Sequence, residues 1–246
     1  MKIIQYIKKN TVFYFVTIMC ITIILLILVY FIFAKMIKHV NSSNIEDKKT
    51  IIIDAGHGGE DGGAVGHDNI TEKNINLSIA LKLKDLLSLI GYDVLMIREN
   101  DKAIYDKDST TLKKKKASDL KNRKKIIKEN TDYNNIFVSI HQNKFPNEKY
   151  HGTQVFHSTK NEKSESLASN IRESIIKRLQ PENFRELRAT GESIFMLRNN
   201  EIPSVIVECG FLSNPEEAKK LNTEEYQLQM AFCIFCGIDK FYIENF

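Results

Sequence analysis

Cysteine is scarce in this sequence, and its four copies do not form a pattern typical of a disulfide framework or a zinc ribbon. Cys20 lies inside an apolar run near the N-terminus, and Cys209 follows a glutamate at the end of an apolar segment. Cys233 and Cys236 form one C-x-x-C pair in a helical pattern, with no second pair to complete a four-cysteine metal site. We therefore interpret this pair as residues packed on a helix face.

The larger part of the chain also lacks an excess of positive charge. The formal net charge is +4, but residues 1–49 carry seven lysines and two acidic residues, and the other 197 residues carry 28 basic and 29 acidic side chains. A nucleic-acid-binding domain is expected to carry its own basic field. We therefore predict that the folded domain has no nucleic acid partner.

One long apolar run interrupts this polar composition. Residues 11–34 contain no charged side chain, and as a helix this run would be about 36 Å long, enough to cross a hydrocarbon core of about 30 Å. It follows a basic flank, residues 1–10, and predicts a transmembrane signal anchor with the rest of the chain on the extracytoplasmic side. Secretion after signal cleavage is the alternative, although the apolar core is long and no A-x-A site follows it.

A polar linker, residues 35–49, precedes a domain that spans residues 50–246. In this domain, short β-branched runs alternate with amphipathic helical patterns. The predicted strands are 50–54, 92–97, 136–141, 153–157, 193–197 and 203–208. The predicted helices are 72–90, 118–130, 161–179 and 224–241. This alternation predicts a single α/β domain with a largely parallel sheet of about six strands and helices on both faces.

Polar residues follow the first predicted strand. Residues 54–59 read Asp-Ala-Gly-His-Gly-Gly, so that His57 stands in a glycine-rich turn at a strand end, where α/β folds place their sites. Glu72 begins the first helical pattern. Each has a simple alternative explanation when taken alone, since His57 could be a hydrogen-bonded bystander and a carboxylate is favourable at any helix N-terminus.

Two further predicted apolar strands end in residues that can bind a metal or transfer a proton. The run 136–141 ends in His141, and the run 203–208 ends in Glu208, which is costly to bury without a partner. Two histidines and one carboxylate, with a further position left for water, form a recurrent catalytic zinc site. A second carboxylate nearby would serve as general base and acid. Together these residues predict a metal-dependent hydrolase.

Three segments carry a resemblance to a known family. Residues 54–59, residues 139–143 (Ser-Ile-His-Gln-Asn) and residues 207–214 (Val-Glu-Cys-Gly-Phe-Leu-Ser-Asn) resemble the hallmark motifs of the zinc-dependent N-acetylmuramoyl-L-alanine amidases, or amidase type 3. The resemblance covers about residues 50–243. It implies that the substrate is peptidoglycan and that the reaction cuts the amide bond between N-acetylmuramic acid and L-alanine.

The same resemblance implies roles for particular residues. His57, Glu72 and His141 would bind Zn²⁺, and Glu208 would be the catalytic carboxylate. Arg98 and Arg123 also match recurrent family positions, and we interpret both as structural.

The layout further resembles the sporulation and germination branch of that family. The chain has one catalytic domain behind an anchor, and the stretch 145–156 is similar to that branch. The resemblance implies action on spore-cortex peptidoglycan, where removal of stem peptides lets muramic-δ-lactam form, and a location in the intermembrane space of the forespore.

Other functions remain open from sequence alone. One is a different zinc hydrolase of the wall, either a peptidase or a polysaccharide deacetylase. Another is a membrane-tethered wall-binding protein without catalysis. A third is an amidase that is active only with an accessory protein.

Overall fold

The computed structural model describes residue 19 and residues 22–31 and 49–246, of which residues 49–246 form one unit. Most of the predicted anchor 11–34, the basic flank 1–10 and all but the last residue of the linker 35–49 lie outside the described residues. Within the described part of the chain, no helix is both long enough and apolar enough to cross a membrane.

A six-stranded sheet forms the centre of this unit, in the order β2-β1-β3-β6-β4-β5. All neighbouring strands run parallel except β4 and β6, which are antiparallel. The strands are β1 Thr50–Ala55, β2 Asp93–Met96, β3 Ile136–Asn143, β4 Gln154–His157, β5 Arg188–Ala189 and β6 Ser204–Phe211. The prediction of a largely parallel, six-stranded α/β sheet is confirmed.

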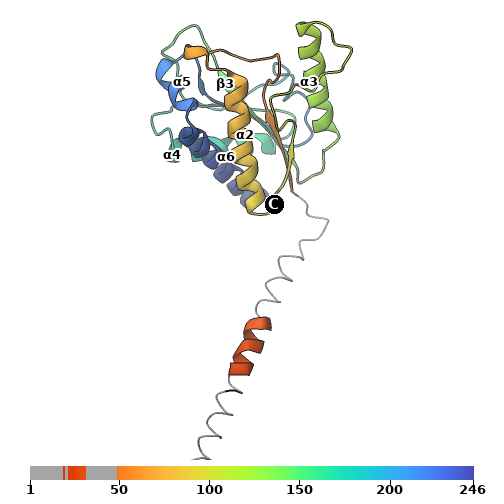
Figure 1. Ribbon diagram of the computed structural model, residues 1–246, viewed down its shortest axis with the longest axis vertical. Helices are drawn as coiled ribbons and strands as arrows, with labels where there is room; N and C mark the ends of the chain where they lie inside the picture. Colours follow the sequence, from red (N-terminus) through yellow and green to blue (C-terminus); the bar gives the residue numbers. More distant parts are fainter. Residues whose placement is uncertain (1–18, 20–21, 32–48) are drawn as a thin grey trace, which may run out of the picture. The chain divides into compact units, whose positions relative to one another are not determined.

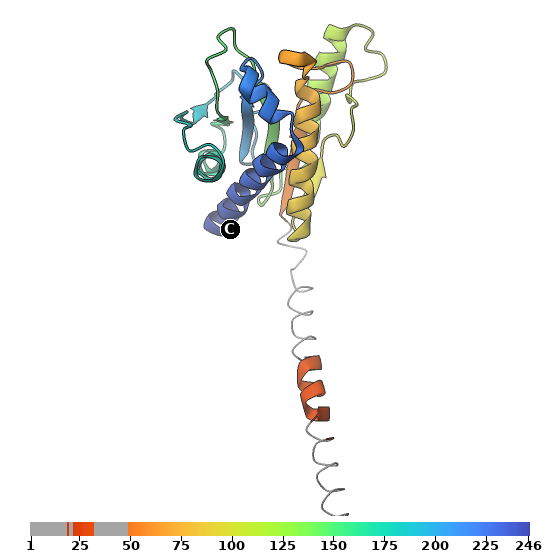
Figure 2. The same cartoon turned by 60° about the vertical axis from the view of Figure 1, so that its left-hand side comes forward.

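Helices cover both faces of this sheet (Figures 1 and 2). One face packs against α2, α4 and α6 through the larger core cluster, and α5 joins the same cluster through Ala218 and Leu221. The other face packs against α3 through a smaller cluster that includes Ile127. The helices are α2 Glu72–Leu89, α3 Leu112–Lys128, α4 Lys163–Arg178, α5 Pro215–Leu221 and α6 Glu224–Asn245.

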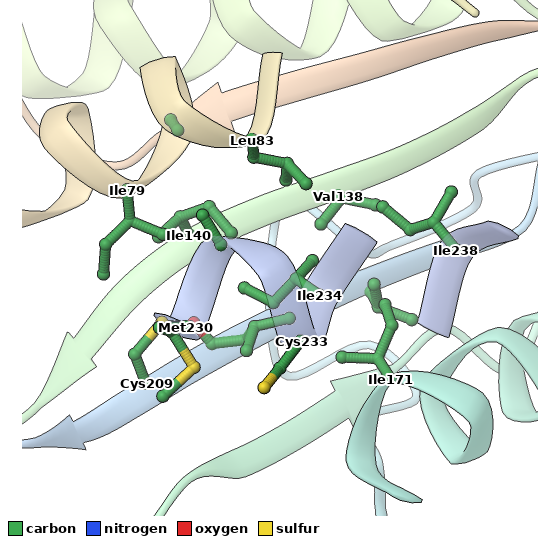
Figure 3. Close-up of a cluster of buried hydrophobic side chains, with 14 of the residues drawn as sticks. Ile79, Leu83, Val138, Ile140, Ile171, Cys209, Met230, Cys233, Ile234 and Ile238 are labelled. Carbon is green, nitrogen blue, oxygen red and sulfur yellow. Dashed lines mark hydrogen bonds between the residues drawn. The ribbon is translucent and has the colours of Figure 1, made fainter. Parts of the chain in front are cut away.

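The larger core lies between the sheet and helices α2, α4 and α6 (Figure 3). Ile79 of α2 lies beside Ile140 of β3, and Ile234 projects from α6 into the same space. Cys233 is free and only 2% exposed in this cluster, so the expectation that the C-x-x-C pair packs on a helix face holds for Cys233.

One predicted strand, 193–197, is wrong. The segment forms turns instead, with backbone hydrogen bonds from Leu197 and Arg198 back to Ile194. Met196 and Leu197 are nevertheless buried in the smaller core cluster. Burial without strand pairing gives the same apolar pattern as a short strand, which explains the error. Three short elements were not predicted, namely the 3-10 helix η2 His67–Asn69, β5 and α5, and α3 begins earlier than expected, at Leu112.

Candidate metal centre and active site

All four predicted site residues lie at one edge of the sheet, formed by the carboxyl ends of its parallel strands. His57 follows β1, and His141 and Glu208 face each other in the register of β3 and β6. Glu72 is the first residue of α2, which follows the loop after β1. The sheet topology therefore brings together residues that are up to 151 positions apart in the sequence.

Three of these residues form a compact cluster. Glu72 lies between the histidines, with its Oε2 3.2 Å from His57 Nε2 and its Oε1 2.9 Å from His141 Nδ1. One ligand atom from each residue lies within 4.8 Å of the others, a set that could hold a metal ion. Two imidazoles and one carboxylate are typical donors for catalytic zinc, so the residues present fit that metal.

The backbone of His57 has an unusual conformation. Its φ is +63°, in the left-handed region that non-glycine residues rarely adopt and that is found preferentially at functional sites. Arg123 stabilises this conformation, because its Nη2 donates a hydrogen bond of 2.7 Å to the carbonyl of His57. The turn closes immediately afterwards through reciprocal backbone hydrogen bonds between Gly58 and Asp61.

Glu72 is the most strongly fixed member of the cluster. It is 3% exposed, and its oxygens accept hydrogen bonds from the backbone amides of Ala64 (2.7 Å) and Gln142 (3.1 Å). Burial alone would raise the pKa of Glu72, but the hydrogen bonds and charges of His141 and His57 outweigh burial and hold that pKa far below its usual range. Glu72 is therefore a carboxylate in the folded protein.

Asp61 orients the first histidine and was not predicted. Its Oδ2 lies 2.9 Å from His57 Nδ1, and its Oδ1 pairs with Lys116 at 2.7 Å. Although burial lowers the pKa of His57, hydrogen bonds to Asp61 and Glu72 raise it to about 9. A carboxylate on the second nitrogen of a metal-binding histidine fixes the ring and increases its basicity. The sequence held one indication of this contact, because Asp61 follows His57 by four residues in the same turn.

Glu208 differs from the other carboxylates because nothing in the described part of the chain satisfies one of its oxygens. Its Oε2 is buried and has no hydrogen-bond partner there. Burial, together with the charge of Glu72, raises the pKa of Glu208 to about 7 in spite of the nearby histidines. A carboxyl group with a pKa near neutrality can both accept and return a proton.

Comparison with known proteins now decides the family. A family model described as N-acetylmuramoyl-L-alanine amidase matches residues 51–240. The chain belongs to this amidase family. It is 35% identical over 197 residues to the germination-specific N-acetylmuramoyl-L-alanine amidase of Bacillus subtilis strain 168, covering 80% of this chain and 81% of the relative. The predicted resemblance to amidase type 3 is thereby confirmed.

Solved structures of the amidase family share the fold. The CwlD amidase of Clostridioides difficile, solved in complex with the GerS lipoprotein, is 42% identical with a TM-score of 0.77, covering 80% of this chain and all of that one. The catalytic domain of the amidase CwlV from Bacillus (Paenibacillus) polymyxa var. colistinus is 29% identical with a TM-score of 0.64, covering 80% and 98%.

The two predicted structural arginines of this amidase chain both support the backbone beneath the cluster. Arg98 donates hydrogen bonds to the carbonyls of Ala55 (2.7 Å) and Gly56 (3.0 Å). Arg123 Nη1 also reaches Ala55 and forms an ion pair with Asp54. Hydrogen bonds from both arginines therefore hold the backbone of the turn that carries His57.

Two glycines of the family motif region are required by close packing. A Cβ on Gly56 would overlap the imidazole ring of His141. Gly63 has a φ of +68°, and a Cβ there would lie 2.5 Å from Glu72 Oε2 and 2.7 Å from His57 Cδ2. Only glycine lets the backbone pass so close to the two histidines and Glu72.

Loops that follow β3 and α4 contribute aromatic residues at this edge of the sheet. The Tyr150 ring stands 5.0 Å from Phe145 and 6.1 Å from Phe211, the last residue of β6. The guanidinium of Arg185 lies over both Tyr150 and Phe211. Phe184 precedes this arginine and is 81% exposed, so its side chain projects into solvent.

Proposed function

We propose that this chain hydrolyses the amide bond between N-acetylmuramic acid and L-alanine in peptidoglycan and that the reaction depends on zinc. The observation that carries the proposal is the cluster of His57, Glu72 and His141 with Glu208 opposite His141, in a chain of the amidase family.

His57, Glu72 and His141 would hold the metal. When bound there, zinc supplies Lewis-acid polarisation of the scissile carbonyl and lowers the pKa of water. The chain's own contribution is to keep the three donors converged. Glu72 is fixed by two backbone amides, and Asp61 aligns the ring of His57.

Glu208 moves the proton. Its carboxylate takes a proton from the attacking water, and its protonated form returns that proton to the departing amine of L-alanine, because amide cleavage needs a protonated leaving group. A pKa raised to about 7 supports both halves of this exchange. The buried, unpartnered Oε2 is the oxygen that the described residues leave available for it.

The biological setting belongs to the same proposal. Two similar proteins are the germination-specific amidase of Bacillus subtilis and the CwlD amidase, whose structure contains a lipoprotein, GerS. We assign this chain to spore-cortex maturation, where stem peptides are removed before muramic-δ-lactam forms. An accessory protein that assists the domain is part of this assignment.

Membrane attachment is also proposed. The uncharged run 11–34 would serve as an uncleaved anchor, with residues 35–49 as linker and residues 50–246 as the catalytic domain on the extracytoplasmic side. Release by signal cleavage is the alternative outcome.

The decisive experiment is digestion of purified peptidoglycan by the full chain, with and without zinc, followed by mass spectrometry. Intact stem peptides that begin at L-alanine are expected, and the Glu208→Gln variant should bind zinc but release none. Peptides cut internally would indicate a peptidase, and free amino groups on the glycan a deacetylase. Zinc-loaded protein that binds peptidoglycan without cleaving it would support a wall-binding role or a need for an accessory protein.

A further inference from the structure

The end of the domain opposite the candidate active site has a surface of its own. Helix α2 links the two ends, because it begins with Glu72, one of the three candidate metal ligands, and ends at Leu89. Its 18 residues correspond to about 27 Å at 1.5 Å per residue. Figure 1 shows the C-terminus, which follows α6, near the end of α2 that is remote from the site.

Large apolar side chains are exposed at this remote end. Leu89, the last residue of α2, is 82% exposed, and the next residue, Ile90, is also exposed. Ile243 and Phe246 are exposed at the end of α6, and Tyr133 is exposed in the loop before β3. We call these five residues the basal surface.

Aromatic contacts hold the parts of the basal surface together. The rings of Tyr92, which lies two positions after Ile90, and Tyr242 on α6 stack 5.1 Å apart. The hydroxyl of Tyr242 donates to the carbonyl of Asn134, and the ring of Phe246 lies 5.5 Å from that of Tyr133. The exposed residues thus lie on well-packed elements, so little backbone freedom is lost when they bind.

The polar groups around the basal surface are mixed in charge. Lys49 lies over the ring of Tyr242, and Lys163 lies over the rings of Tyr133 and Phe246. Two nearby carboxylates have partners, since Asp239 accepts from Tyr92 and Glu244 accepts from Asn170. Exposed apolar residues rimmed by tyrosine and lysine are typical of membrane–water interfaces.

The chain enters the domain at the same end. Thr50 begins β1, and its backbone amide donates to Asn135, two positions after Tyr133. The carbonyl of Lys49 accepts from Asp93, just after Tyr92. The predicted anchor ends at residue 34, and 15 linker residues span at most about 50 Å even when fully extended. Such a tether keeps the basal surface at a high effective concentration near the bilayer.

We propose that the basal surface binds the lipid bilayer to which the chain is anchored, with Leu89, Ile90, Ile243 and Phe246 inserted among the headgroups. This inference rests on the proposed anchor. Contact at this end points the edge with His57, Glu72 and His141 away from the bilayer, toward the wall. The length of α2 then sets a height of about 27 Å for the site above the lipid surface.

The sequence contains no tryptophan, so one introduced tryptophan reports a single position. The reporter variant is Leu89→Trp, and the matched control is Phe184→Trp, because the two parent side chains are 82% and 81% exposed. Phe184 precedes Arg185, which lies over Phe211 at the carboxyl end of β6 and therefore on the side of the candidate site. Each full-length variant is reconstituted into phosphatidylcholine vesicles with and without brominated acyl chains. The tryptophan of Leu89→Trp should be blue-shifted and lose most of its fluorescence to bromine, whereas that of Phe184→Trp should keep its fluorescence.

A second reporter, Ile243→Trp, tests the same surface from α6 and should give the same result as Leu89→Trp. Equal fluorescence of Leu89→Trp in both kinds of vesicle would overturn the proposal. A blue shift without bromine quenching would also overturn it, because a protein, either a second copy or a partner, would then cover the surface. A chain that fails to float with vesicles would overturn both this inference and the anchor. Loss of the proposed amidase activity would leave the quenching unchanged, so the two failures are distinguishable.

Discussion

Asp54 and Arg123 form a buried ion pair directly beneath the candidate active site. The Oδ1 and Nη1 atoms are 2.5 Å apart, and the side chains are 1% and 2% exposed. Arg123 also pairs with Asp119 and donates to the carbonyl of His57. One guanidinium therefore pairs with two carboxylates and fixes the backbone of a candidate metal ligand.

Replacing Arg123 by methionine should destabilise the protein by about 3–5 kcal/mol, because it leaves buried carboxylates without their partner. Urea unfolding of metal-free protein measures this loss. Lys125→Met on the same helix is the control, since its ion pair with Glu129 is exposed at 3.7 Å and should contribute at most about 0.5 kcal/mol. Equal stability of the two variants would contradict the structural role of Arg123.

Adding one methyl group at Gly56 should abolish zinc binding. The Cβ of Gly56→Ala would overlap the ring of His141, which must move away from Glu72. Gly62→Ala is the control in the same loop, because nothing lies within 4 Å of its Cβ position. Isothermal titration with zinc should show binding by the control and none by Gly56→Ala. Zinc binding by Gly56→Ala with parental affinity would remove His141 from the ligand set.

Removing the charge of Asp61 should weaken zinc binding by about 10- to 100-fold, because the hydrogen bond to His57 Nδ1 aligns the ring and raises its basicity. The change is Asp61→Asn, and competition with a coloured chelator measures the affinity. Glu60→Gln alters the neighbouring residue, which pairs with Lys115 on the surface, and should keep the parental affinity. A weakening shared by both variants would indicate a general loss of negative charge instead.

The stability of the metal-free protein should fall as the pH rises between about 5 and about 9. The pKa of Glu208 is raised to about 7 and that of His57 to about 9, so the folded state binds more protons than the unfolded state across this range. For Glu208 alone the loss is about 3 kcal/mol. Urea unfolding in chelator at a series of pH values measures it.

Glu208→Gln should flatten the lower part of that pH profile, up to about pH 7, because its amide does not titrate. Added zinc should stabilise the protein more at high pH than at low pH, since the metal competes with protons for the histidines. A chelated parent protein that is equally stable throughout the range would show that these raised pKa values do not occur.

Sequence patterns predicted most of the fold because they report burial and period directly. The apolar runs that became β1, β3 and β6 are continuous, as expected for parallel strands buried on both faces. The same property explains the wrong strand at 193–197, whose buried Met196 and Leu197 lie in turns. Burial is visible in a sequence, but strand pairing is not.

The candidate site residues could be found because each marks a change in a recognisable local pattern. His57 follows β1 and Glu72 starts α2. The apolar runs of β3 and β6 stop at His141 and Glu208, although the strands themselves continue to Asn143 and Phe211. Asp61 has no such marker, since it lies in an irregular loop. Its hydrogen bond to His57 depends on a left-handed backbone at His57 and on the turn between Gly58 and Asp61. The metal and catalytic roles of these residues stay predictions.

The sequence by itself determined the α/β class, the amidase family and the residue types available for chemistry, because strand ends, helix starts and motifs are local features. Only the tertiary structure decided which groups meet. Parallel pairing of β3 with β6 sets His141 opposite Glu208, and the packing of α2 on the sheet inserts Glu72 between two histidines. It also decided that the two ends of α2 differ, one polar at the site and one apolar and exposed. Such relationships depend on contacts between distant segments, which no local pattern encodes.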